Sequence, residues 1–164
     1  MSFTWHLDRR DTVKVLVVYD SAYGNTELIA KAIGGAIGGE SRVVRASEVN
    51  PDEIRTTDLL IIGSPTHGGR PTPAIQDFID KAPGDAVNCV KVAAFDTRFS
   101  SRMVRVFGYA AERIAISIEA KGGKLVSPPE AFFVKGKKGP LREGELERAA
   151  TWAKMISTNL SLKS

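Results

Sequence analysis

Apolar residues in this chain gather in short runs, and amphipathic stretches separate the runs. The run 13–19 is rich in β-branched residues and the run 59–62 is apolar at every position, which is typical of strands buried on both faces. A third run covers 90–95. After the first run, isoleucines recur every four residues over 29–37, as they do on one face of a helix. The pattern predicts an α/β protein in which buried strands alternate with helices.

The rest of the chain continues this alternation. The predicted strands are 13–19, 42–45, 59–62, 90–95 and a fifth strand split into 124–126 and 131–134 by Pro128 and Pro129. The first predicted helix covers 26–37, the second begins at Pro51 after an Asn50 cap, and the third begins at about 72–73. The fourth carries a buried stripe of Val104, Phe107, Ala111, Ile114 and Ile118. The last covers 143–158, with Leu146, Ala149, Ala150, Ala153 and Ile156 inward. This order predicts one domain over 12–160, a doubly wound parallel sheet with helices on both faces, preceded by an N-terminal arm at 1–11.

Three polar loops are expected beyond the carboxyl ends of the strands, where ligands bind in such sheets. They cover 20–26, 63–71 and 96–101. The first leads into a helix, whose unpaired amides and dipole favour an anion, and Ser21 and Thr26 can add hydroxyl donors. The loop therefore predicts a phosphate cradle. A strand–helix connection that binds nothing is the alternative.

Composition narrows the function. The chain has 164 residues, 43% of them hydrophobic, and a formal net charge of +4, which fits an ordinary globular domain. The apolar runs are strand-sized, which predicts no membrane insertion. The single cysteine, Cys89, excludes an internal disulfide and favours a cytoplasmic location; its thiol is predicted to be inert and at least half-buried. No zinc or cluster spacing and no nucleic-acid motif is present, and the basic loop 135–140 is predicted to be a solvated turn.

Two of the loops resemble those of a known family. Residues 19–27, Tyr-Asp-Ser-Ala-Tyr-Gly-Asn-Thr-Glu, are similar to the FMN phosphate loop of flavodoxins, Ser/Thr-x-Thr/Tyr-Gly-Asn-Thr. Residues 63–68, Gly-Ser-Pro-Thr-His-Gly, resemble the second flavin loop of that family, including its version in the flavodoxin domains of flavodiiron proteins. The resemblance implies a flavodoxin-like α/β fold of the short-chain type, with a five-stranded parallel sheet of order 2-1-3-4-5 and non-covalently bound FMN.

The resemblance also implies a cofactor site. The phosphate would lie against the amides of the first loop, and the isoalloxazine would border 66–69, where Gly68 and Gly69 can adopt the positive φ that a flipping loop peptide needs. The implied cofactor-binding residues are Ser21, Ala22, Tyr23, Gly24, Asn25, Thr26, Ser64, Pro65, Thr66, His67, Gly68, Gly69, Asp96, Thr97, Arg98 and Phe99. No catalytic residue and no metal ligand is implied.

Three features depart from the family pattern. His67 stands where flavodoxins usually place an aromatic residue against the inner flavin face. In the third loop, which usually carries a stacking tyrosine, either Phe99 stacks on the ring or Arg98 lies beside it; an ordinary surface ion pair is the alternative for Arg98. The chain is also net basic, whereas flavodoxins are typically acidic. Asp20 is expected to point away from the phosphate or to cap the turn.

These expectations favour a carrier that cycles FMN by one-electron steps. Two alternatives remain open: an FMN-dependent NAD(P)H oxidoreductase acting on quinones or flavins, and a non-redox module that binds another phosphate ligand. The expected partners are redox proteins, acidic ones if the basic loops dock them. Neither a nucleic acid nor a membrane is expected as a partner, and the protein is expected to be a monomer or a weak homo-oligomer.

Overall fold

The structure is a computed structural model that describes residues 13–37, 40–99 and 109–162. Its strands are β1 (Lys14–Tyr19), β2 (Glu40–Arg45), β3 (Leu59–Pro65), β4 (Lys91–Phe99), β5 (Lys124–Leu125) and β6 (Glu130–Val134). They form one sheet in which every pairing is parallel, with the order β2-β1-β3-β4-β5. The short β5 pairs with the start of β4 and β6 pairs with its end, both on the edge of β4 that faces away from β3. The predicted order and the split fifth strand are thus confirmed.

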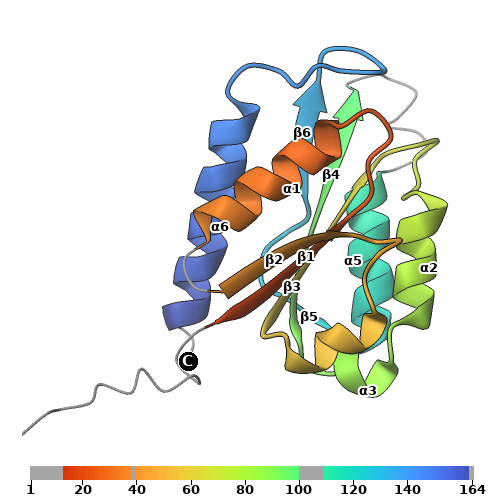
Figure 1. Ribbon diagram of the computed structural model, residues 1–164, viewed down its shortest axis with the longest axis vertical. Helices are drawn as coiled ribbons and strands as arrows, with labels where there is room; N and C mark the ends of the chain where they lie inside the picture. Colours follow the sequence, from red (N-terminus) through yellow and green to blue (C-terminus); the bar gives the residue numbers. More distant parts are fainter. Residues whose placement is uncertain (1–12, 38–39, 100–108, 163–164) are drawn as a thin grey trace, which may run out of the picture.

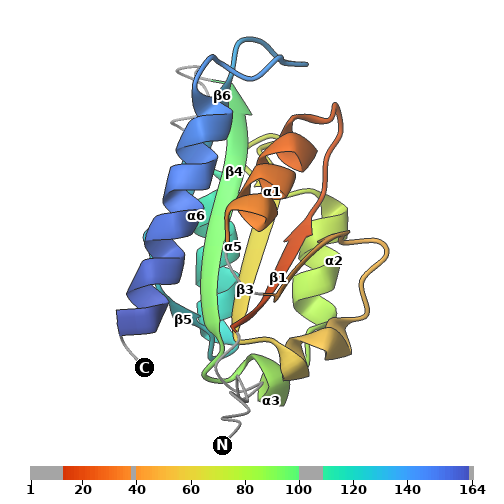
Figure 2. The same ribbon diagram turned by 60° about the vertical axis from the view of Figure 1, so that its left-hand side comes forward.

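Helices cover both faces of the sheet, as predicted (Figure 1). They are α1 (Asn25–Ala36), the 3-10 helix η1 (Pro51–Thr56), α2 (Pro73–Lys81), α3 (Gly84–Val87), α5 (Ala110–Ala120) and α6 (Glu145–Leu162). Figures 1 and 2 show α1 and α6 on one face and α2 and α5 on the other. Among the described residues, no helix is long and apolar enough to cross a membrane.

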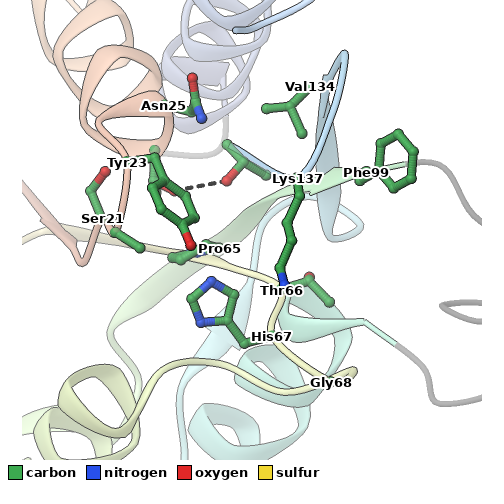
Figure 3. A pocket seen from close by; sticks show the side chains of 13 residues that line it. Ser21, Tyr23, Asn25, Pro65, Thr66, His67, Gly68, Phe99, Val134 and Lys137 are labelled. Atoms are coloured by element: carbon green, nitrogen blue, oxygen red, sulfur yellow. Dashed lines mark hydrogen bonds between the residues drawn. The ribbon is translucent and has the colours of Figure 1, made fainter. Parts of the chain in front are cut away.

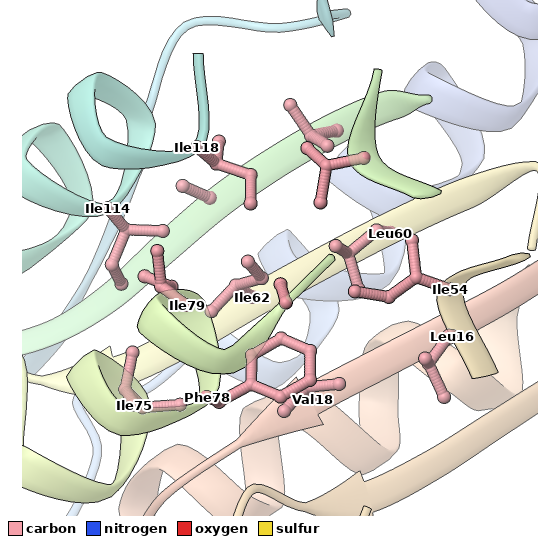
Figure 4. Packing of buried hydrophobic residues seen from close by; sticks show 14 of the residues in the cluster. Leu16, Val18, Ile54, Leu60, Ile62, Ile75, Phe78, Ile79, Ile114 and Ile118 are labelled. Atoms are coloured by element: carbon pink, nitrogen blue, oxygen red, sulfur yellow. The ribbon is translucent and has the colours of Figure 1, made fainter. Parts of the chain in front are cut away.

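Strand alternation divides the core into two layers. On β1, Leu16 and Val18 face the layer under η1, α2 and α5, and Val17 faces the layer under α1 and α6. Figure 4 shows the first layer, where isoleucines of β3 and α5 meet Phe78 of α2. Because successive strand residues point to opposite faces, a strand that is apolar at every position supplies both layers at once.

Two strands extend further than predicted. β3 continues through Pro65 and β4 through Phe99, so residues expected to be loop are paired in the sheet. Their register pairs Ser64 with Asp96 and Pro65 with Thr97. On its other side, β4 from Phe95 onward pairs with β6, so residues 95–97 have a partner on both edges. The prediction of an exit loop at 96–101 was therefore wrong for 96–99, and residues 100 and 101 lie outside the described residues.

Side chains at two positions differ from expectation. Cys89 is exposed, not buried, because it occupies a turn with φ 69° in which its amide donates to the carbonyl oxygen of Gly122. Leu146 is exposed rather than inward. The carboxylate of Glu145 is held by the amide of Phe133 and by Arg148, which fixes the rotation of the first turn of α6 and turns Leu146 outward.

The other helix predictions are confirmed in part, and some of them fall outside the described residues. Ala149, Ala153 and Ile156 are buried as predicted, and Trp152, which the pattern did not select, is buried beside them. Ala150, also predicted to face inward, is only half-buried. The Asn50 cap is confirmed by its Oδ1, which accepts from the amide of Asp52 at 3.0 Å. Helix α5 begins only at Ala110, because Tyr109 before it is extended; its buried residues include the predicted Ala111, Ile114 and Ile118. The arm 1–11, Val104 and Phe107 lie outside the described residues.

Candidate functional site

A cavity of about 500 Å³ lies at the carboxyl edge of the sheet, the edge at which the polar loops were predicted to meet (Figure 3). Segments far apart in the sequence form its walls: the loop after β1, the end of β3 with the turn that follows, the end of β4, and the end of β6. Its lining residues are Ser21, Ala22, Tyr23, Asn25, Thr26, Pro65, Thr66, His67, Gly68, Thr97, Phe99, Val134 and Lys137.

The loop after β1 is held open toward the first turn of α1. Gly24 at the N-cap has φ 93° and leaves the helix without a side-chain cap. The hydroxyl of Ser21 accepts from the amide of Gly24 at 3.0 Å. Asp20 turns away, as expected: its Oδ1 accepts from the amide of Ser21 and from Arg45. The first amides of an α-helix have no intrahelical acceptor, so this N-terminus offers donors to an anion without a nearby free carboxylate.

Thr26 ties this loop to the end of β4. Its hydroxyl and that of Thr97 are 2.7 Å apart, and both residues are buried. Figure 3 draws this bond as a dashed line. It fixes the start of α1 against β4, so the first and third segments of the site keep one relative position.

The segment after β3 is a tight turn. The amide and carbonyl of His67 bond reciprocally with those of Arg70, at 3.0 Å each way. Gly68 and Gly69 between them have φ of 58° and 78°, positive values that glycine adopts without a side-chain penalty. Ser64, before the turn, is buried, and its Oγ accepts from the amide of Thr72 at 3.0 Å. The turn thus projects His67 and Gly68 to the cavity from a fixed base.

Successive residues at the end of β4 lie on opposite faces of the sheet. Thr97 and Phe99 line the cavity, whereas Asp96 and Arg98 point to the opposite side of the sheet, as strand alternation requires. Asp96 is fully buried, and both its oxygens accept from Arg98, at 2.8 and 2.7 Å. The guanidinium of Arg98 lies 3.4 Å from the ring centre of Tyr109.

The Asp96–Arg98 pair settles the alternatives for Arg98. Burial disfavours the guanidinium charge, but the hydrogen bonds and charge of Asp96 outweigh it and raise the pKa of Arg98. Asp96 also accepts from the amide of Ala111 at 3.0 Å, in the first turn of α5. Arg98 therefore forms an ion pair, a buried one instead of the surface pair considered from sequence, and it does not lie beside the cavity.

The sequence did not identify the fourth wall. Val134 and Lys137 line the cavity, although 135–140 was predicted to be only a solvated turn. The side-chain amide of Asn25 donates to the carbonyl of Lys138 at 3.2 Å, which joins this loop to the first one. A signal was present: in a parallel sheet the carboxyl end of the fifth strand lies at the same edge as the others, so the segment after β6 had to arrive here.

Most of the predicted site residues meet at this cavity. Those that line it are Ser21, Ala22, Tyr23, Asn25, Thr26, Pro65, Thr66, His67, Gly68, Thr97 and Phe99. Those that do not line it are Gly24, Ser64, Gly69, Asp96 and Arg98. Gly24, Ser64 and Gly69 shape the backbone of the two loops, and Asp96 with Arg98 anchors α5.

The residues present fit FMN. The uncapped N-terminus of α1 suits a phosphate, and the remaining walls combine apolar side chains with hydroxyl groups, as a flavin ring with a polyhydroxyl chain requires. No aspartate or glutamate is among the lining residues of the described chain, so none would repel the phosphate there.

Comparison with known proteins identifies the family of this chain. The family model described as "Flavodoxin" matches residues 17–152. A flavodoxin of Aquifex aeolicus (strain VF5) is 36% identical, over 44% of this chain and 41% of that protein. An NAD(P)H dehydrogenase (quinone) of Chromohalobacter salexigens is 30% identical, over 43% of this chain and 48% of that protein. The matches thus span less than half the length of both curated relatives.

Among solved structures, a flavodoxin from the domain Archaea has a TM-score of 0.76 at 23% identity, covering 91% of this chain and 99% of its own. At that identity the likeness shows the fold alone. The family model covers most of the chain and includes both loops that carry the resemblance. The chain therefore belongs to the flavodoxin family, the FMN-binding family that its first two loops resemble.

Proposed function

We propose that this chain holds FMN in the cavity at the carboxyl edge of the sheet and carries electrons between redox proteins. The observation that carries the proposal is the meeting of the two flavodoxin-like loops with Thr97 and Phe99 in one cavity of about 500 Å³. Membership of the flavodoxin family supports it. When bound, FMN supplies redox chemistry in one-electron steps.

In this proposal each wall has its own task. The amides at the start of α1 and the Ser21 hydroxyl hold the phosphate. The hydrogen bond between Thr26 and Thr97 fixes the start of α1 against β4. His67 and Gly68 border the flavin ring from the second loop, opposite Phe99 on β4. Tyr23 and Phe99 are 49% and 43% exposed, so the mouth of the cavity is aromatic and accessible to a partner. An accessible flavin edge is what transfer between two proteins requires.

The test is a flavin titration. Purified protein mixed with FMN is expected to retain about one flavin per chain after dialysis, with an absorbance spectrum shifted from that of free FMN. Riboflavin, which lacks the phosphate, is expected to bind at least about tenfold more weakly, because the α1 terminus would have no anion to hold. Equal affinity for both flavins would contradict the phosphate cradle. Retention of neither flavin would overturn the proposal.

A second candidate is an FMN-dependent NAD(P)H oxidoreductase. One relative is named NAD(P)H dehydrogenase (quinone), and the exposed His67 and Gly68 leave the second loop open to a substrate. Of the arginines that could attract an anionic nicotinamide, Arg98 is occupied by Asp96, while Arg70 is exposed. Steady-state NAD(P)H oxidation with a quinone acceptor separates the two functions, since a carrier is expected to show almost no turnover without an added reductase.

We further propose an acidic redox protein as the partner. Arg70, Lys135, Lys137 and Lys138 belong to the turn and the loop that border the cavity, and within the described ranges no ion pair occupies any of them. Electron transfer from a reduced acidic ferredoxin is expected to slow as NaCl rises from about 0.05 to 0.5 M, because salt screens exposed charges. A rate that stays constant or rises with salt would contradict a basic docking surface.

The cellular setting and the assembly are also proposals. A single cysteine suits a reducing cytoplasm, so a cytoplasmic location is consistent with the sequence. A monomer or a weak homo-oligomer leaves the cavity mouth free for a partner, which a carrier needs. The organisation as one domain over 12–160 with an arm at 1–11 is proposed on the same footing.

A further inference from the structure

A lysine outside both flavodoxin-like loops lines the cavity. Lys137 follows β6 and belongs to the cavity wall, whereas its neighbours Lys135 and Lys138 do not. Figure 3 shows the Lys137 side chain extending into the pocket, with its amine toward the second loop and away from Asn25 of the first. The cation thus points to the part of the cavity assigned to the flavin ring, not to the phosphate.

The backbone holds Lys137 in this place. The amide of Gly139 donates to the carbonyl of Gly136 at 3.0 Å, and the amide of Lys135 donates to the carbonyl of Pro140 at 2.8 Å. These bonds close a turn with Lys137 and Lys138 as its two central residues. Lys137 is directed inward, while the ammonium of the adjacent Lys138 lies 5.9 Å from the ring centre of Tyr23.

Asn25 fastens this turn to the cofactor loop. Its side-chain amide donates to the carbonyl of Lys138 at 3.2 Å, and Gly139 packs directly against it. A Cβ on Gly139 would lie 2.6 Å from Oδ1 of Asn25, and the φ of 100° there also favours glycine. Only a residue without a side chain allows so close an approach, so the turn is positioned by the cradle itself.

Among the described residues, no acidic side chain lines the cavity opposite Lys137. Acidic residues of the neighbouring segments are paired with arginines, Asp96 with Arg98, and Asp20 and Glu27 with Arg45. Lys137 is the one lysine or arginine among the lining residues of the described chain. The ring side of the cavity therefore presents a positive potential to whatever occupies it.

We propose that Lys137 binds reduced FMN more tightly than oxidised FMN and so makes the flavin easier to reduce. The proposal rests on the proposed function, because it requires FMN in this cavity. Reduction adds negative charge to the flavin, and a nearby ammonium stabilises that charge by Coulomb attraction. Electrons arrive from the donor protein and leave to the acceptor. Lys137 itself forms and breaks no bond.

The test compares Lys137→Met with two matched variants. Dissociation constants of oxidised FMN and of dithionite-reduced FMN are measured for each protein, with thermal melting as a check of folding. In Lys137→Met, the affinity for reduced FMN is expected to fall about tenfold more than that for oxidised FMN. Lys137→Arg, which keeps the charge, is expected to retain the wild-type ratio. Lys135→Met removes the same charge from the same loop outside the cavity, and is expected to change the ratio less than about twofold.

Each other outcome overturns the proposal. An equal loss of affinity for both redox states would show that Lys137 binds the cofactor without regard to charge on the ring. If that loss occurs with FMN but not with riboflavin, Lys137 is a phosphate ligand instead. An unchanged ratio in Lys137→Met would show that the cation does not act on the flavin. Failure of the proposed function is seen separately, since the wild-type protein would then bind no FMN.

Discussion

Replacing Arg98 by methionine is expected to lower the free energy of unfolding by about 3–5 kcal/mol. Asp96 is fully buried, and the substitution removes the guanidinium that neutralises both of its oxygens. The variant must bury an unpaired carboxylate, protonate it, or open the start of α5 to water, and each of these destabilises the native state. Urea-induced unfolding followed by circular dichroism, without FMN so that binding adds nothing, measures the change.

Two companion variants isolate the cause. Arg42→Met removes an arginine from an exposed pair with Glu53, and is expected to change the free energy of unfolding by less than about 1 kcal/mol. The double variant Asp96→Leu with Arg98→Met is expected to be more stable than Arg98→Met alone, because no unpaired charge remains. If Arg98→Met were as mild as Arg42→Met, the buried pair would not anchor α5.

Replacing Gly63 by alanine is expected to destabilise the protein by about 3 kcal/mol, near the upper end for overpacked cores. An added Cβ would lie 2.0 Å from the ring of Phe95, its direct partner across β3 and β4. That ring has no room to withdraw, because Phe132 and Trp152 pack edge-on against it with centroids 6.0 and 6.2 Å away. Strand β3 must therefore shift, and with it the turn that begins after Pro65.

This displacement is expected to weaken FMN binding as well as folding, since His67 and Gly68 follow on the displaced strand. Gly35→Ala is the matched control: Gly35 lies in α1, and an added Cβ would meet no atom within 4 Å. There the change is expected to stabilise the helix by up to about 1 kcal/mol. Thermal melting with and without FMN measures both effects. An alanine at 63 that leaves the melting temperature unchanged would contradict the packing described for Phe95.

The sequence predicts those strands whose pattern of apolar residues is visible locally, and misses those held by residues far away in the chain. Strands β1 and β3 were predictable because both of their faces are buried, which makes them apolar at nearly every position. The end of β4 was not, since Asp96, Thr97 and Arg98 are polar in sequence. They stay in the sheet because β6 pairs with all three, because β3 pairs with Asp96 and Thr97, and because Asp96 and Arg98 neutralise each other. Such pairing does not show in a one-dimensional pattern.

The site, too, has residues that local sequence signals predict and residues that only the tertiary structure brings to the cavity. Gly24 and Gly68 mark their turns locally, through the positive φ that glycine allows, so the first two walls could be located in advance. Which residues of β4 face the cavity depends on the phase of a strand that was taken for a loop. The contribution of Lys137 depends on where the chain returns after β6. Exposure of Leu146 has a similar origin, because a buried Glu145 sets the rotation of α6.

The contact between Asn25 and the turn after β6 also bears on biosynthesis. The cavity begins with residues made early, at Ser21, and is completed only by Val134 and Lys137. During translation the first two walls leave the ribosome long before the last one, so a nascent chain presents an unfinished pocket. FMN loading is therefore expected to follow synthesis of most of the polypeptide, because a nascent chain that ends before β6 lacks Val134 and Lys137 of the cavity wall.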